Sequence, residues 1–229
     1  MTLDEANRLV ASVPHWHHAF EIYPGLRTPG SYQPQFLLDR LSLEANLRGM
    51  RVLDIGASDG FFSREVHRRG ADVVSIDYRD RHQHGFGVME QLYGHRFDYR
   101  RANIYDLSAA DLGQFDIILC LGVIYHLPDI MRAFAIIRSL ARGIVLIETE
   151  ADNQFCPDVA AARYYVDSTL NRDWTNFWVP NRQCVVDMLQ DSGFDVVRDD
   201  SWGTRMLAEA KINSEPGRLR KIRAAYGVF

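Results

Sequence analysis

The stretch Arg51-Val-Leu-Asp-Ile-Gly-Ala-Ser-Asp-Gly-Phe-Phe-Ser63 decides how this chain folds. In it a hydrophobic run meets an acidic residue, and a turn punctuated by Gly56 and Gly60 then opens a helix near Phe61. A parallel strand delivers its carboxyl end to a crevice in this way, and the two glycines let the backbone turn tightly and approach a ligand. We therefore expect a nucleoside cofactor to bind at this turn.

The next apolar run, Asp72-Val-Val-Ser-Ile-Asp77, ends in a carboxylate. It follows the glycine turn at the distance where nucleotide-binding folds place the acidic residue that holds a ribose diol. The pattern therefore predicts that Asp77 binds the ribose of the cofactor.

The spacing of the glycines separates two classes of cofactor. The dinucleotide fingerprint needs three glycines so that a pyrophosphate can sit on the helix N-terminus, and here the middle position is Ser58. Asp54 and Asp59 flank the turn, and their charges would repel a pyrophosphate but attract the sulfonium and ammonium groups of S-adenosylmethionine (SAM). The turn therefore favours SAM over a nicotinamide dinucleotide.

With these residues the chain resembles the class I SAM-dependent methyltransferases, in which V-L-D-I-G-x-x-x-G is the first motif and an acidic residue ends the second strand. The resemblance implies an enzyme that uses SAM. It also implies that Asn103 lies near the adenine with Ile104 as an apolar wall, although a residue of this type also shapes turns. The cofactor-binding residues expected on this basis are Asp54, Gly56, Ala57, Ser58, Gly60, Asp77, Tyr78, Asn103, Ile104, Leu121 and Tyr125.

Apolar segments with strand periodicity alternate with segments of helical periodicity, which is the pattern of a parallel sheet covered on both faces. Two further runs, 194–197 and 205–212, are joined closely enough to form an antiparallel pair. We expect parallel strands at 51–55, 72–77, 97–101, 115–121 and 143–149, and helices at 60–69, 86–94, 128–141 and 181–191.

The predicted fold class is α/β. With the resemblance, it is a doubly wound, mostly parallel seven-stranded sheet with a terminal antiparallel strand, the Rossmann-like methyltransferase fold. At 229 residues the chain is expected to form a single domain, 1–229. Its expected parts are an N-terminal lid and helix (1–48), a SAM-binding core (49–150), a substrate-cap insertion (151–180), and a C-terminal helix with antiparallel strands (181–229).

Composition narrows the range of partners. The formal net charge of −4 argues against a nucleic-acid partner, because neutralising phosphates needs a concentrated basic face. No long apolar span or signal peptide is visible, so we expect a soluble, cytoplasmic protein without a membrane partner. Cys120, Cys156 and Cys184 are widely spaced and predict neither a disulfide framework nor a zinc site.

The segment from Phe115 to Asp129 carries the residues expected to do chemistry. Its apolar run ends at Gly122, and Tyr125 and His126 are left at the carboxyl edge of the sheet, where ligands bind. A hydroxyl attacks a methyl sulfonium more easily when a base removes its proton, and an imidazole titrates near neutral pH. His126 is therefore the candidate base, with packing against the methionine part of SAM as its alternative role.

Glu148 is a second catalytic candidate, because it ends the fifth expected strand beside the expected pocket. It could bind the acceptor hydroxyl or act as the base. Glu148, Glu150, Asp152 and His126 could also converge on a divalent metal. Nothing in their spacing specifies such a site, and we expect none.

Three segments carry a closer resemblance: Trp16-His-His-Ala-Phe-Glu-Ile-Tyr-Pro-Gly-Leu-Arg-Thr-Pro-Gly30, Gly122-Val-Ile-Tyr-His-Leu-Pro128 and Asn176-Phe-Trp-Val-Pro-Asn181. Together with the first motif they resemble the family that includes the tRNA wobble-uridine carboxymethyltransferases and their small-molecule methyltransferase relatives. In that family the first segment closes over the cofactor and the last lies across the substrate mouth. The resemblance implies that Trp16, His17, His18 and Thr28 line the site, with lid packing as the alternative for each.

Two departures from that family limit what can be transferred. Members that move a carboxymethyl group have a lysine after the N-terminal tryptophan, but His17-His18 stands here, and a neutral histidine would hold the extra carboxylate weakly. The tRNA-modifying members are also longer and more basic. We therefore expect methyl transfer to a hydroxyl of a small polar acceptor.

A long polar and aromatic insertion separates the fifth expected strand from the helix at 181–191. Loops of this length are usually functional or contain their own helices. Aromatic and amide side chains suit sugars or hydroxylated metabolites, although an ordinary cap over the sheet uses the same residue types. The substrate-binding residues expected overall are Trp16, His17, His18, Thr28, Arg163, Tyr165, Trp174, Asn176 and Trp178.

The sequence thus predicts a SAM-dependent O-methyltransferase whose acceptor is a saccharide or a natural product. Two alternatives stay open. A tRNA wobble-uridine methyltransferase would need an Arg-lined face beside the pocket. A SAM-binding module without activity would have an obstructed methyl pocket.

Overall fold

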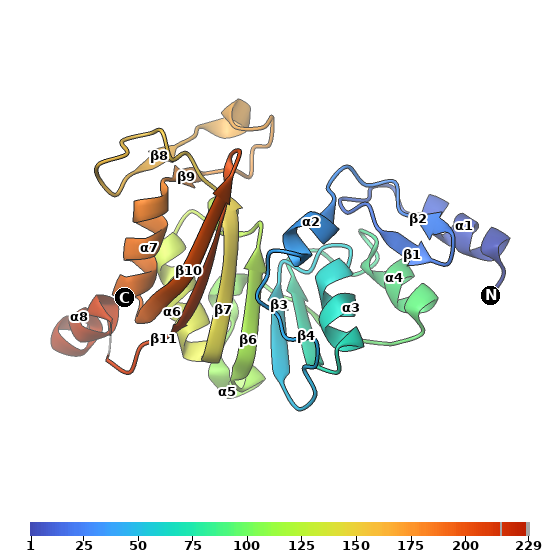
Figure 1. Cartoon of the computed structure of the whole chain (residues 1–229), viewed down its shortest axis with the longest axis horizontal. Helices are drawn as coiled ribbons and strands as arrows, with labels where there is room; N and C mark the ends of the chain where they lie inside the picture. The colour runs from blue at the N-terminus through green and yellow to red at the C-terminus, as the bar shows by residue number, and fades with distance from the viewer. Residues whose placement is uncertain (216, 228–229) are drawn as a thin grey trace. The chain divides into compact units, whose positions relative to one another are not determined.

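The computed structural model describes residues 1–215 and 217–227 (Figure 1). The chain forms two compact units, Met1–Asn103 and Ile104–Phe229. Seven strands belong to one mostly parallel sheet with an antiparallel pair at one end. This confirms the predicted α/β fold class. The expectation of a single domain stays a prediction.

The first unit contains three parallel strands. β3 (Arg51–Ile55) pairs with β4 (Asp72–Asp77), and β4 pairs with β5 (Asp98–Arg101). Ile55 lies opposite Ile76, so the glycine turn after β3 and the carboxylate that ends β4 occur at the same edge. The other elements are α1 (Leu3–Ala11), β1 (Glu21–Tyr23), β2 (Leu26–Arg27), α2 (Pro34–Leu38), α3 (Phe61–Arg68) and α4 (Phe86–Tyr93).

The second unit contains the antiparallel pair. β6 (Phe115–Leu121) is parallel to β7 (Ala141–Glu150), whereas β11 (Arg205–Ile212) is antiparallel to β7 and to β10 (Phe194–Trp202). Figure 1 shows β7, β11 and β10 side by side. The remaining elements are η1 (Ile104–Asp106), α5 (Ala109–Leu112), η2 (Ile124–His126), α6 (Ile130–Leu140), β8 (Ala162–Tyr164), η3 (Asp167–Thr169), β9 (Trp178–Pro180), α7 (Arg182–Asp191) and α8 (Arg218–Tyr226).

The predicted strands and helices are present, with bounds shifted by a few residues. Capping explains two of the shifts. α6 begins at Ile130 rather than 128 because the Asp129 side chain accepts a hydrogen bond from the Arg132 N–H (2.9 Å). The Asn181 side chain accepts in the same way from the Cys184 N–H (2.9 Å), so α7 begins at Arg182. β10 continues to Trp202, beyond the predicted 194–197.

Two features go beyond the sequence expectation. A helix was expected within residues 1–48 but without bounds, and α1 begins at a capping box that the sequence itself displays: the Glu5 N–H donates to Thr2 Oγ1 (3.3 Å) and the Thr2 N–H to Glu5 Oε2 (2.6 Å). For the insertion, the sequence leaves a functional role and helices of its own as alternatives. It contains the antiparallel pair β8–β9 and the three-residue 3-10 helix η3. Backbone pairing between distant segments decided this structure, and local periodicity does not report it.

Buried side chains hold β6, the strand that precedes His126, in place. Phe115, Ile118, Leu119 and Cys120 of β6 are completely buried, as expected for a strand covered on both faces. Burying each large side chain contributes about 1.5–3 kcal/mol. The backbone that follows β6 is therefore anchored firmly.

Among residues 1–215 and 217–227, no helix is long and apolar enough to cross a membrane. The cytoplasmic location stays a prediction.

Candidate functional site

The turn after β3 uses its backbone N–H groups inside the protein. The N–H groups of Gly56 and Ala57 both donate to the Ile76 carbonyl (2.8 and 3.0 Å), and the Gly60 N–H donates to the Ala57 carbonyl (2.9 Å). The Ser58 N–H donates to Asp77 Oδ2 (3.0 Å). A pyrophosphate needs such donors pointing at it. These four donors are therefore engaged within the protein, which agrees with the glycine spacing.

Positive backbone angles make this turn possible. Gly56 has φ 79° and Gly60 has φ +82°, and Ser58 takes φ 49° without being glycine. A Cβ on Gly60 would also lie 3.0 Å from the Phe86 ring. Gly60 thus serves the packing of α4 as well as the turn.

Asp54 lies beneath this turn. Its carboxylate is buried and accepts a hydrogen bond from Ser63 Oγ (2.6 Å), which also contacts Ser75 Oγ (2.8 Å). Burial raises the pKa of Asp54 from 3.8 to about 6, although the bonds from Ser63 oppose the shift. The described contacts of Asp54 tie α3 to β3 and β4.

Asp59 connects the turn to the N-terminal segment. Its carboxylate is fully buried and accepts three backbone hydrogen bonds, from the N–H groups of His17 (2.7 Å), His18 (2.8 Å) and Gly85 (3.0 Å). The negative charge of Asp59 was expected to attract a cationic cofactor, but three backbone N–H groups already compensate it. We therefore correct that part of the electrostatic argument: Asp59 organises backbone.

The N-terminal segment packs tightly on this region. Trp16 is buried, its indole N–H donates to the Val10 carbonyl (3.0 Å), and a Cβ on Gly85 would lie 2.0 Å from its ring. Thr28 is also buried and donates from Oγ1 to the His18 carbonyl (2.6 Å). These contacts fit the lid-packing alternative for Trp16 and Thr28.

The two histidines of this segment differ in exposure. His18 is 5% exposed, and burial lowers its pKa well below the usual value. His17 is exposed, and its ring stacks on Tyr32 with a centroid distance of 5.4 Å. His17 is thus the more accessible of the two.

Asp77 ends β4 where the sequence predicted it. Besides the Ser58 N–H, its carboxylate accepts bonds from the Arg79 backbone N–H (3.0 Å) and from Arg79 Nε (3.2 Å). The following residue, Tyr78, is 68% exposed. The Ala102 N–H donates to the Asp77 carbonyl (2.9 Å), which holds the loop of the exposed Asn103 at the end of β4.

Two residues of this region were missed. Arg79 is paired with Asp77, which raises the guanidinium pKa although burial alone lowers it. His84 is buried; its Nε2 lies 3.1 Å from Tyr99 Oη and its Nδ1 lies 3.9 Å from Asp59 Oδ1. Arg79 stands two residues after Asp77 and could have been found from that spacing. No sequence signal marks His84.

The second unit positions the predicted catalytic residues. The Gly122 N–H donates to the Glu148 carbonyl (2.9 Å), and Gly122 has φ +71°, so the chain leaves β6 sharply and forms η2. Leu121 and Tyr125 are partly buried there. Ile104, in η1, is 6% exposed and offers an apolar wall.

Glu148 has a partner that the sequence did not reveal. Arg205 Nε donates to Oε1, Nη2 donates to Oε2 (2.7 Å), and Nη1 donates to Glu150 Oε1 (3.0 Å). Burial raises the pKa of Glu148, and the bonds and charge of Arg205 oppose this shift. With both oxygens bound to one guanidinium, Glu148 is poorly arranged to take a proton.

The imidazole of His126 contacts the insertion. Its Nδ1 lies 2.9 Å from Thr175 Oγ1 and 3.3 Å from the Thr175 carbonyl oxygen. Thr175 in turn donates from Oγ1 to Asp173 Oδ1 (2.6 Å). Asp173 and Thr175 were both missed, because they are 47 and 49 residues from His126 in the sequence.

The predicted substrate residues of the insertion are spread over buried and exposed positions. Trp178 donates from Nε1 to the Pro128 carbonyl (3.2 Å), whereas Trp174 is 72% exposed. Asn176 is 3% exposed, and its Oδ1 has no hydrogen-bond partner among the described residues. Arg163 lies over the Phe155 ring (4.4 Å) and near Tyr165 Oη (3.5 Å).

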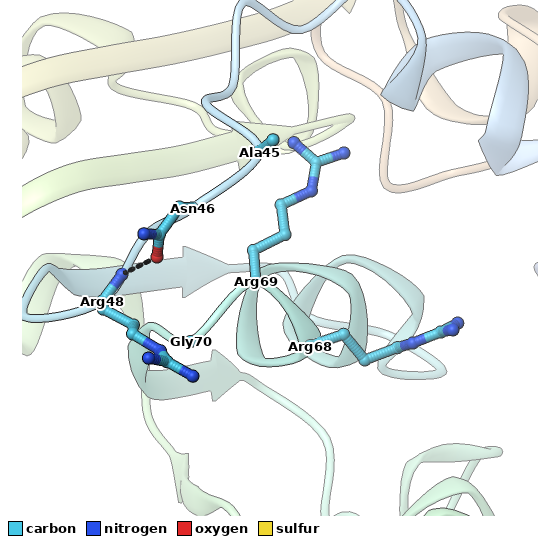
Figure 2. Close-up of a pocket in the computed structure, with 6 residues that line it drawn as sticks. All are labelled: Ala45, Asn46, Arg48, Arg68, Arg69 and Gly70. Carbon is cyan, nitrogen blue, oxygen red and sulfur yellow. Dashed lines mark hydrogen bonds between the residues drawn. The ribbon is translucent and has the colours of Figure 1, made fainter.

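An additional pocket lies away from all predicted residues. Figure 2 shows it near the end of α3, lined by Ala45, Asn46, Arg48, Arg68, Arg69 and Gly70. The three guanidinium groups point in different directions, and Arg69 donates to the Leu43 carbonyl (3.1 Å). Basic residues here complement the negative end of α3, which accounts for them without a ligand.

Within residues 1–215 and 217–227, no group of three or more His, Cys, Asp or Glu side chains is arranged to hold a metal ion.

Comparisons with known proteins agree with this geometry. The family described as "Methyltransferase domain" matches residues 27–199. Ubiquinone biosynthesis O-methyltransferases match over part of the chain: the protein of Hahella chejuensis is 37% identical over 40% of this chain and 39% of its own, and that of Xanthomonas oryzae is 36% identical over 46% and 43%. The chain thus spans less than half the length of these curated relatives.

Solved structures show the same fold at low identity. The N-terminal domain of EvdMO1 with SAH bound has a TM-score of 0.69 and 16% identity, over 94% of this chain and 98% of that chain. The 1,6-didemethyltoxoflavin-N1-methyltransferase of Burkholderia thailandensis has a TM-score of 0.57 and 18% identity, over 73% and 72%. The closer resemblance to the tRNA wobble-uridine family is not confirmed by these comparisons.

Proposed function

Because the chain belongs to the class I SAM-dependent methyltransferases, we propose that it transfers a methyl group from SAM to a hydroxyl oxygen of a small polar molecule. The observation that carries the proposal is the imidazole of His126, which follows β6 and whose Nδ1 is bound by Thr175. An imidazole held in this way can take a hydroxyl proton as the oxygen attacks.

The first unit supplies residues that fit SAM. Asp77 is the proposed ribose ligand, because its carboxylate ends β4 and a carboxylate has more acceptor sites than its three described donors fill. The exposed ring of Tyr78 offers a flat face to the adenine, and Asn103 offers an amide. Bound SAM would supply the electrophilic methyl group on its sulfonium.

The turn after β3 is proposed to surround the methionine part of SAM. Gly56 and Gly60 keep the backbone close to the ligand, and the internally bonded N–H groups present no donors for a phosphate. Asp54 is proposed to act through the position of α3. Ile104, Leu121 and Tyr125 stay proposed as apolar contacts of the cofactor.

The acceptor is proposed to be a hydroxylated small molecule. The unpartnered Oδ1 of Asn176 supports this, since a buried acceptor without a donor is costly and a substrate hydroxyl would satisfy it. The partial relatives are named as O-methyltransferases of ubiquinone biosynthesis, and one EvdMO1 structure was determined in the presence of D-fucose. Phenols and sugars are therefore the first acceptors to test.

A labelled-methyl screen tests this function. The full chain is incubated with SAM carrying an isotopically labelled methyl group and with catechols, D-fucose and other sugars, aliphatic amines, or bulk tRNA, and products are read by mass spectrometry. We expect label on a hydroxyl of a small molecule. Label in tRNA alone would favour the wobble-uridine alternative, and SAM binding without transfer to any acceptor would favour the non-catalytic module.

Asp77 is the residue whose replacement should weaken SAM binding most. Replacing Asp77 with Ala removes the proposed ribose ligand, and we expect the Kd measured by calorimetry to rise about tenfold or more, the factor of one charged hydrogen bond. Asp72→Ala is the matched control, because Asp72 begins the same strand and is exposed. Equal affinities of Asp77→Ala and Asp72→Ala would refute the ribose assignment.

A further inference from the structure

We propose that Thr175 and Asp173 are positioning residues that hold the neutral His126 ring with its proton on Nδ1, so that Nε2 is the basic atom. The inference deepens the proposed function and rests on it only for the use made of Nε2. It concerns a segment of the insertion, between η3 and β9, to which the sequence assigned no catalytic part.

Asp173 determines where the hydroxyl proton of Thr175 goes. Asp173 Oδ1 receives hydrogen bonds from the Thr175 backbone N–H (2.9 Å) and from Thr175 Oγ1 (2.6 Å). Burial raises the pKa of Asp173, but these two bonds lower it further, so the carboxyl pKa lies below its usual value. An ionised carboxylate can only accept, so the single hydroxyl proton of Thr175 is spent on Asp173.

The proton of His126 follows from this. Thr175 Oγ1 has only lone pairs left for Nδ1, at 2.9 Å, and the second neighbour of Nδ1 is the Thr175 carbonyl oxygen at 3.3 Å, which is also an acceptor. Two acceptors that face one ring nitrogen are satisfied only if that nitrogen carries a proton. We therefore assign the proton to Nδ1 and the lone pair to Nε2.

The segment that carries Thr175 is fixed to the loop that carries His126. The Phe177 N–H donates to the Tyr125 carbonyl (2.8 Å), and Trp178 Nε1 donates to the Pro128 carbonyl (3.2 Å). These bonds lie on either side of His126 in the sequence. The end of the insertion that follows Thr175 is therefore fixed to the loop on both sides of His126, as a positioning role requires.

The chain of hydrogen bonds from Asp173 through Thr175 to His126 also stabilises the positive charge that forms on the ring during the reaction. As the acceptor oxygen bonds to the methyl group and the sulfonium becomes a thioether, the hydroxyl proton moves to Nε2 and the ring becomes an imidazolium. Asp173 faces that charge through Thr175. The ring of Tyr125 also contacts His126, with a centroid distance of 4.2 Å, and Arg205 lies over the Tyr125 ring and binds Glu148 and Glu150.

The test measures the tautomer directly and needs no acceptor. The full chain is labelled with ¹⁵N-histidine, and long-range ¹H–¹⁵N correlation spectra are recorded at a pH where the ring is neutral. The His126 signals are identified by their loss in His126→Gln. We expect the wild-type ring to carry its proton on Nδ1. Thr175→Val removes the hydroxyl acceptor of Nδ1, and Asp173→Ala frees the Thr175 hydroxyl proton for donation to Nδ1; each should shift the ratio of the two tautomers about fivefold or more toward Nε2–H, the factor of one hydrogen bond.

Two further variants guard against trivial explanations. Thr169→Val removes another hydroxyl of the insertion, which donates to the Val166 carbonyl (2.6 Å), and should leave the His126 tautomer unchanged. Thr175→Ser keeps a hydroxyl and should retain the wild-type tautomer. A wild-type ring protonated on Nε2, or no shift in Thr175→Val and Asp173→Ala, would overturn the inference.

Failure of the proposed base would look different. His126→Gln could still transfer labelled methyl at near wild-type rates while the wild-type ring carries its proton on Nδ1. In that case His126 is not the base, but Thr175 and Asp173 still position its ring. The two hypotheses are therefore tested separately.

Discussion

Two buried carboxylates, one in each unit, have different kinds of partner. In the first unit Asp59 is held by three backbone N–H groups, whereas in the second unit Glu148 is held by the side chain of Arg205. A backbone donor survives most substitutions of its own residue, but a side-chain donor does not. The hydrogen bonds of Asp59 should therefore be lost only when Asp59 itself is substituted. The contact of Glu148 should be lost when either Glu148 or Arg205 is substituted.

The largest effect is expected at Asp59. Asp59→Ala leaves three buried N–H groups without an acceptor, and each such group costs about 1–3 kcal/mol, so we expect the free energy of unfolding to fall by about 4 kcal/mol. Urea denaturation measures it. His17→Ala is the matched control, because it keeps the N–H group and removes only an exposed ring; it should change the free energy by less than about 0.5 kcal/mol. A large loss in His17→Ala would break the comparison.

A smaller loss is expected at Arg205. Arg205→Met strands the charge of Glu148 in the interior, and we expect the free energy of unfolding to fall by about 3 kcal/mol. Glu148→Gln should also destabilise, because the guanidinium loses its partner. The double variant should lose less than the sum of the two single losses. Additive losses would show that the pair does not act as a unit.

The smallest effect is expected at Asp54 and depends on pH. The folded pKa of about 6 lies above the ordinary 3.8, so the folded state binds the extra proton between these values. The stability that Asp54 contributes is therefore fully present below about pH 4 and is lost as the pH rises through about 6. In Asp54→Asn, which keeps an acceptor for Ser63, this dependence should disappear, giving a gain over wild type of about 1–3 kcal/mol at pH 7. Parallel stability curves between pH 4 and pH 7 would contradict the assignment.

The sequence predicted the elements whose signals are local. β3, β4 and β6 were found because apolar runs end at Gly56, Asp77 and Gly122, and α7 was found because its periodic stretch is bounded by Asn181 and Gly193. β8 and β9 were missed because each has three residues and exists only through its partner.

The candidate site divides in the same way. The sequence placed Asp77 at the end of β4 and His126 after β6, and the structure has Asp77 as the last residue of β4 and His126 as the last residue of η2. The partners that define their chemistry were not predictable: Arg205 is 57 residues from Glu148, and Thr175 is 49 residues from His126. The roles of the individual site residues stay proposals.

The sequence by itself determined the α/β class, the SAM-type turn and the positions of the acidic and imidazole groups, because hydrophobic periodicity and glycine spacing act over a few neighbouring residues. Only the tertiary structure decided what each group does. It placed three backbone N–H groups on the Asp59 carboxylate, paired Glu148 with Arg205, and brought Thr175 to His126 Nδ1. These outcomes depend on which donors the fold brings within about 3 Å, and hydrogen bonds have no range beyond that distance.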